Sequence, residues 1–272
     1  MDIDLARRLA DAVLYAGTTT HGVLGRWQFG VLMPADVADT DPSQPATAQT
    51  ECVVEVGARF RLRVLLRFLQ VQRRTVYRWL PGHGRFTPVD ALDVDGKPFV
   101  ACDEAVAREM TYEATAVSAH GPRHTLRVPG AFARTELRDA RGALVGQVVR
   151  RRRPLTAALD LSAVAVPGPR RALRLRVGLE NQTRAATADR DAALVASHLI
   201  LSVEDGAFVS MVDPPTWAAD AVESCANVGL YPVLAGAHGD DDTLLATPLI
   251  LSDHPAAAAE IDEVLLLRTL AG

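Results

Sequence analysis

Cysteine is scarce in this sequence: Cys52, Cys102 and Cys225 are the only three in 272 residues, and they stand far apart. Their spacing excludes a disulfide framework and the paired thiolates of a zinc or iron–sulfur site. A few separate, reduced thiols are typical of cytoplasmic proteins. The sequence therefore predicts a cytoplasmic protein without a cysteine-held metal.

Long apolar runs are also missing. No stretch approaches the roughly 20 apolar residues that a membrane helix needs. The N-terminal segment "MDIDLARRLADAVLYAG" has acids where a secretory signal carries basic residues, and charged side chains interrupt its apolar positions. We therefore expect neither a membrane span nor a secretory signal.

Basic residues are not in excess. The chain has 29 Lys and Arg against 33 Asp and Glu, a formal net charge of −4 and a pI near 6.0. Nucleic-acid-binding proteins usually carry a basic surplus that neutralises phosphates, so this composition argues against nucleic acid as a partner. The arginines nevertheless cluster at residues 59–78, 150–153 and 170–176, which leaves room for a local basic face.

Motifs for nucleotide binding and hydrolytic chemistry are absent as well. The chain has no G-x-G-x-x-G, Walker loop, G-x-S-x-G or H-E-x-x-H. The stretch "VDGKP", residues 94–98, has a lysine without the glycine spacing of a phosphate loop, and predicts a hairpin turn. We predict no cofactor and assign no catalytic residue.

Hydrophobic residues make up 49% of the chain, enough for a sizeable core. Residues 3–14 have apolar positions at helical spacing, which predicts an amphipathic helix. From residue 51 onward period-two alternation dominates: one face carries Phe60, Leu62, Val64, Leu66 and Phe68, the other Arg61, Arg63 and Arg67. A phase shift after Leu69 predicts a bulge or bend.

These patterns predict an α+β fold that is mainly β. Residues 1–186 are expected to form an antiparallel β-sandwich with an N-terminal helix, since strands recur without helices between them. Residues 187–272 are expected to form a mixed α/β portion packed on it. This portion starts with a hairpin that turns at Asp205-Gly206.

Six residues are candidates for binding. In "VSMVDPPTW", residues 209–217, Asp213 ends a strand and is expected to be the N-cap of the next helix, whose apolar face includes Trp217. Asp213, Trp217 and His254 would then lie at the ends of C-terminal strands. Arg150, Arg151 and Arg152 either contact phosphate or an acidic partner, or form a charged, wet sheet edge that discourages aggregation.

Histidines and acids provide candidates for a metal site. His238 and Asp240 lie in the stretch "AHGDDD", and His198 lies in an apolar strand. Imidazole and carboxylate groups suit a divalent cation, but neighbouring ligands in one short loop rarely converge on one ion, so a solvated loop is the commoner structure. Ser202 or Ser210 paired with His198 or His254 for acyl transfer lacks any local signature.

Several stretches together resemble a family of uncharacterised proteins of actinobacteria and related bacteria, encoded near high-affinity [NiFe] hydrogenases and their maturation factors. The stretches are residues 10–17, 26–34, 67–76, 203–218, 225–236, 245–255 and 260–270. The family carries an aromatic segment of the Tyr-Pro-Tyr-Arg kind, where this chain has "TTTHGVLG", residues 18–25. A contact made by that segment would therefore be altered here.

The resemblance and the missing catalytic motifs favour a non-enzymatic accessory protein that binds another protein. The resemblance implies a metalloenzyme subunit or maturation factor as the partner, for example of a hydrogenase. One alternative is a metal-dependent or hydrolytic enzyme with a site assembled from C-terminal strand ends, at His198, Asp213, His238 and His254. The other is a self-assembling structural protein, and a homo-oligomer stays open.

Overall fold

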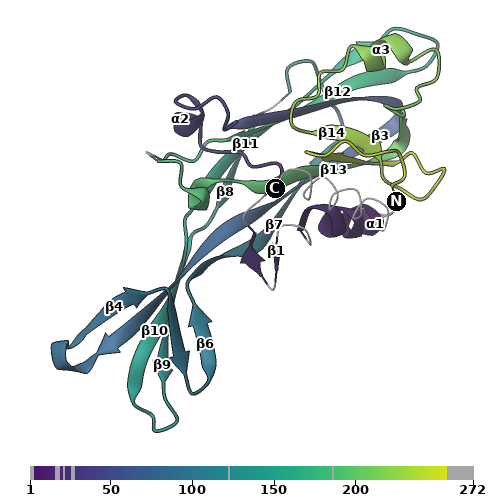
Figure 1. Cartoon of the computed structure of the whole chain (residues 1–272). Coiled ribbons are helices and arrows are strands. Elements are labelled where there is room, and N and C mark those ends of the chain that lie inside the picture. The colour runs from purple at the N-terminus through teal and green to yellow at the C-terminus, as the bar shows by residue number, and fades with distance from the viewer. Residues whose placement is uncertain are drawn as a thin grey trace.

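One strand, β3 (Thr47–Leu80), organises the sheet of the computed structural model and extends into a projecting arm (Figure 1). The structure describes residues 3–15, 19–20, 22–25, 28–121, 123–185 and 187–255. The predicted class is confirmed, because the chain forms a large antiparallel sheet with an N-terminal helix. No helix among these residues is long and apolar enough to cross a membrane.

The helices are short and the strands are numerous. The α-helices are α1 (Ile3–Ala10), α2 (Ala35–Ala38) and α3 (Ala219–Glu223), and α1 continues as a π-helical turn over Asp11–Tyr15. The other strands are β1 (Thr19–Thr20), β2 (Val23–Leu24), β4 (Arg85–Val89), β5 (Ala91–Val94), β6 (Lys97–Val100), β7 (Cys102–Ala114), β8 (Arg123–Val128), β9 (Ala131–Arg138), β10 (Leu144–Arg152), β11 (Leu155–Val166), β12 (Ala172–Asn181), β13 (Val195–Phe208), β14 (Tyr231–Leu234) and β15 (Thr243–Thr247).

Successive parts of β3 have different neighbours. Residues 47–55 pair with β12, which continues to β11 and β8. Residues 62–74 pair with β7, and residues 54–69 pair with β13, which continues to β15 and β14. The last part of β3 pairs with β10 and β4. Strands on both sides of the predicted boundary near residue 186 therefore share one sheet.

A bulge in β3 separates its first two parts. Val56 lies opposite Gly206 and Arg61 opposite Glu204, so four residues of β3 oppose only Asp205 of β13. Asp205 has a φ of 52°, and its carboxylate accepts a hydrogen bond from the Arg59 N–H at 2.5 Å. The predicted hairpin at Asp205-Gly206 is therefore wrong: these residues bend a continuing strand, because long-range pairing with β3 outweighs their local turn preference.

The main core lies on one side of β3, where its inward residues pack against β11, β12 and β13. Leu62, Leu66, Leu159, Leu175 and Leu199 are among its fully buried side chains. The apolar side of α1 packs on the opposite face of the sheet, where a second cluster is buried. Both faces of β3 are thus covered in this region, which explains the continuous burial of residues 64–71.

The bulge or bend predicted after Leu69 has a different explanation. Pairing between β3 and β7 is uninterrupted from Leu62 to Arg74, so the strand has no bulge there. Leu69 and Val71 belong to the cluster under α1, whereas Val76 belongs to a separate small core in the arm. The phase shift in the sequence therefore reflects a change in which face of β3 is covered by other parts of the chain, and not a break in the strand.

The arm comprises residues 72–101 and 130–152, and contains β4, the end of β3, β10 and β9 side by side, with the β5–β6 hairpin (Figure 1). One face packs against the hairpin through Val76, Leu92, Leu137 and Val148. The predicted turn in "VDGKP" is confirmed, because residues 95 and 96 join β5 to β6 with positive φ angles.

Asn181 fixes the connections around the end of β12. Its side-chain N–H groups donate to the carbonyls of Leu32 and Ala192, both at 2.8 Å, and its side-chain oxygen accepts from the Thr183 N–H at 3.0 Å. The residue is fully buried. Asn181 also begins the triplet Asn-Gln-Thr, which matches a glycosylation acceptor, but its amide has no access to solvent.

We predict that Asn181→Ala lowers the free energy of unfolding by about 3 kcal/mol, because the Ala192 carbonyl and the Thr183 N–H lose their partner in the interior and the Leu32 carbonyl keeps only the Leu194 N–H. Chemical denaturation measures this loss. Gln182→Ala, at the neighbouring and less buried position, is the control and should cost less than about 1 kcal/mol. Equal effects of the two substitutions would contradict the assigned role.

Candidate functional site

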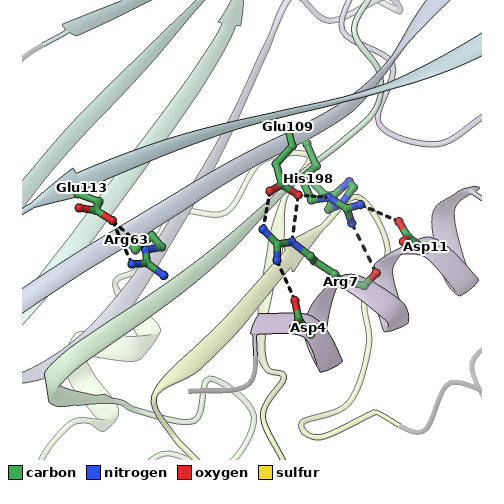
Figure 2. Close-up of polar contacts among 8 residues, drawn as sticks. Asp4, Arg7, Asp11, Arg63, Glu109, Glu113 and His198 are labelled. Atoms are coloured by element: carbon green, nitrogen blue, oxygen red, sulfur yellow. Dashed lines mark hydrogen bonds and ion pairs between the residues drawn. The ribbon is translucent and has the colours of Figure 1, made fainter.

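A charged network joins α1 to the sheet (Figure 2), and Arg67 of β3 lies at its centre. The Arg67 guanidinium lies 2.9 Å from the Asp11 carboxylate and 3.1 Å from the Glu109 carboxylate. The ring of Tyr15 lies 5.4 Å from the guanidinium carbon, within range of a cation–π contact. Since the Arg67 side chain is only 9% exposed, these partners compensate a cation that has lost its water.

Glu109 also pairs with α1 itself. Arg7 donates to its carboxylate at 3.0 Å and 2.5 Å, and to Asp4 at 2.8 Å. The hydrogen bond with Glu109 is the main cause that raises the pKa of Arg7. The helical segment is therefore held to β7 through Arg7 and to β3 through Asp11, as well as by its apolar side.

His198 of β13 lies in this network and is completely buried. Its Nδ1 donates to the Ala196 carbonyl at 2.8 Å, which leaves the Nε2 lone pair facing Arg67 at 3.5 Å. Burial, with a smaller contribution from the Arg67 charge, lowers the pKa of His198 to about 3. The imidazole is therefore neutral at physiological pH, and it is enclosed by the protein.

The predicted metal residues do not assemble. Within the residues that the structure describes, no group of three or more His, Cys, Asp or Glu side chains is placed to hold a metal ion. His198 lies under α1, whereas His238 and Asp240 are exposed in the loop after β14. His238 meets His254 instead, with ring centroids 5.3 Å apart.

The end of β13 is tied to the C-terminal strands by hydrogen bonds. Ser210 donates to the Asp253 carboxylate at 2.5 Å and accepts from the Asp213 N–H at 2.8 Å. Asp253 in turn accepts from the Leu234 N–H at 2.8 Å. Ser210 thus bonds to an acid and backbone groups, and its hydroxyl is not directed at His254.

Asp213 is exposed and does not cap a helix, because α3 begins only at Ala219 after the N-cap Ala218. The predicted N-cap is wrong since the two prolines are followed by a turn before the helix starts. The apolar contact predicted for Trp217 is present: it packs with Ala221 and Val222 against Val53. Binding at Asp213, Trp217 and His254 stays a prediction.

Arg150, Arg151 and Arg152 have separate environments. β10 pairs with β3 and β9 as far as Arg152, so the predicted sheet edge is wrong: the strand is interior, and its neighbours come from distant parts of the chain. Arg150 donates a hydrogen bond to the Glu104 carboxylate at 3.0 Å, and Arg74 donates to the same carboxylate at 2.9 Å. Arg152 is partly buried, whereas Arg151 is exposed.

Glu104 is the carboxylate at the base of the arm. Burial alone would raise its pKa, but hydrogen bonds from Gln72 and Arg150 and the charges of Arg150 and Arg74 outweigh it, so the pKa is lowered. The carboxylate is thus ionised and neutralises two arginines between arm and body. Arg151 points to the other face, where no ion pair links it to an acid within the described residues.

That other face of the arm is the open face, which we define by Tyr77, Trp79, Phe86, Phe132, Arg134 and Arg151. Strand register places these side chains opposite the β5–β6 hairpin. Phe132 is 64% exposed, and the rings of Trp79 and Phe86 pack with centroids 4.8 Å apart. Aromatic and arginine side chains on an uncovered sheet face are the composition typical of protein interfaces.

The sequence contained a signal for part of this face. Thr75, Tyr77 and Trp79 alternate with Val76 and Arg78, as expected of a strand with two different faces. Phe132 lies more than 50 positions away, and only the pairing of β9 with β10 and β10 with β3 brings it alongside.

No protein-family model and no curated protein matches the chain. Among solved structures, the secretin InvG of the Salmonella SPI-1 type III secretion injectisome, in its open gate state, aligns with 85% of this chain and 69% of its own chain, at 9% identity. The TM-score of 0.11 is too low for an argument about fold or function.

We predict that the buried, neutral His198 makes stability depend on pH. Because its pKa is about 3 in the folded protein and near 6.5 when unfolded, the unfolded state binds an extra proton between these values. Stability contributed by the neutral imidazole is therefore complete above about pH 6.5, and falls by about 1.4 kcal/mol per pH unit as the pH drops toward 3.

Denaturation of wild type and His198→Asn from pH 7 to 4 isolates this effect, since the asparagine does not titrate. The free energy of unfolding of the variant should lack the histidine contribution to its dependence on pH. The control His238→Gln, in an exposed loop, should keep that contribution. Parallel profiles for wild type and His198→Asn would contradict a buried neutral imidazole.

Proposed function

We propose that this is a non-enzymatic accessory protein of the cytoplasm that binds another protein through the open face of its arm. The observation that carries the proposal is the uncovered aromatic and arginine surface on that projecting sheet. The other face of the arm is already packed against the β5–β6 hairpin, so the open face is the one left for a partner. Its β3 strand continues directly into the body, which limits the entropy lost on binding.

Charge supports an acidic surface on the partner. Residues 72–101 and 130–152 contain 11 Lys and Arg and 5 Asp and Glu, a net charge of +6, so the rest of the chain carries −10. Complementary charge speeds association and selects among partners. The resemblance to proteins encoded near [NiFe] hydrogenase genes supports a metalloenzyme subunit or maturation factor as this partner. The three cysteines are free thiols, in keeping with a cytoplasmic setting.

The alternative of a metal-dependent or hydrolytic enzyme at the C-terminal strand ends receives less support. His198 is separated from His238 and His254 and held beside Arg67. Burial raises the pKa of Cys102 and raises that of Cys225 to about 11, so neither thiol is activated as a nucleophile.

We predict that the double substitution Phe132→Ser and Arg151→Glu weakens partner binding at least 100-fold, because it removes an exposed aromatic anchor and reverses a charge on the same face. A photo-crosslinking residue at position 132 would identify the partner in the native host. Titration with the purified partner then gives the affinity, and its salt dependence reports the charge contribution.

The matched control is Ile250→Ser with Arg59→Glu, which changes an exposed apolar side chain and a charge on the body. This control should bind as the wild type does. A partner that binds the arm variant with unchanged affinity would overturn the assignment of the arm, and a purified protein that turns over a substrate would overturn the non-enzymatic function.

A further inference from the structure

Ser202 of β13 has a buried hydroxyl that no described group satisfies. The residue is 1% exposed, and its Oγ has no hydrogen-bond partner. A buried hydroxyl without a partner lowers stability, so such a group is usually explained by water or a ligand. Ser202 lines a cavity of about 80 Å³, together with Arg61, Arg63, Glu113, Thr115 and Glu204. We call this cavity the Ser202 groove.

The polar side chains of the groove come from one row across three strands. Ser202 of β13 lies opposite Arg63 of β3, and Arg63 lies opposite Glu113 of β7. Four residues further along each strand, on the same face, His198, Arg67 and Glu109 form an equivalent row. The helix α1 covers that row (Figure 2). The Ser202 row lies beyond the start of α1, beside a second hollow of about 310 Å³ next to Asp4 and Arg7.

The ion pairs of the groove are exposed to solvent, so their partners can exchange. Arg63 places Nε and Nη2 at 3.1 and 3.0 Å from one oxygen of Glu113, although its planar fork suits a carboxylate with two oxygens. The Glu113 side chain is 66% exposed, so this pair contributes little to stability. Arg61 and Glu204 are 3.9 Å apart and both exposed.

We propose that the Ser202 groove binds a small zwitterion, with an ammonium and a carboxylate on neighbouring carbons as in a free amino acid. The ligand carboxylate takes the fork of Arg63 as this side chain leaves Glu113. That movement opens the buried Ser202 hydroxyl, which then donates a hydrogen bond to the same carboxylate. The ammonium is held by the released carboxylate of Glu113, with Glu204 close by. Two cations and two anions around a small cavity match a ligand with both charges and no net charge. The site lies on the body and is independent of partner binding by the arm.

Binding of glycine and L-alanine, measured by saturation-transfer NMR and equilibrium dialysis on the full chain, tests this proposal. Acetate and methylammonium serve as ligands with only one of the two charges. The amino acids should bind at least tenfold more tightly than either. Ser202→Ala should weaken them about tenfold, and Glu113→Gln should weaken the amino acids without weakening acetate.

Ser162→Ala, on β11 outside the groove, should bind as the wild type does. Thermal unfolding checks the fold of each variant; Ser202→Ala should fold, because it removes only a hydroxyl without a partner. Absence of amino-acid binding, equal binding of acetate and glycine, or unchanged binding by Ser202→Ala would each overturn the proposal. In these cases water alone fills the groove.

Discussion

The hydrogen-bonding demand of one 34-residue strand determines the architecture of this protein. Each residue of β3 presents an N–H and a C=O, and burial requires partners for both. The strand therefore collects β12, then β7 and β13, then β10 and β4 along its length. Since the same strand forms the core and the arm, the proposed binding face is a direct extension of the most buried part of the molecule.

Arginine has three different roles on this sheet, and the role depends on which acids lie across the strands. Arg67 is buried and compensated by Asp11 and Glu109, so it fixes α1. Arg150 is neutralised by Glu104 at the base of the arm. Arg151 is the next residue along and faces the opposite side, where it is exposed. A run of arginines that looks uniform in sequence therefore divides into structural residues and a binding candidate.

The α1 helix separates two cross-strand rows with the same chemistry. In each row an arginine of β3 lies between a glutamate of β7 and a polar residue of β13, which is His198 in one row and Ser202 in the other. Under the helix, the row is sealed, and the neutral imidazole of His198 is part of the packing. Beyond the helix, Ser202 is itself buried but borders a cavity among charged side chains, so equivalent positions become a candidate binding site.

The sequence by itself determined the mainly β class, the amphipathic N-terminal helix, the turn at Asp95-Gly96 and the absence of local catalytic motifs. These features depend on side-chain periodicity and on residues close together in the chain. Only the tertiary structure decided that Asp205-Gly206 bends a continuing strand opposite the bulge in β3, that Arg150 pairs with Glu104, and that Phe132 joins Tyr77 on one face. These features depend on strand register between distant segments, which local propensity does not encode.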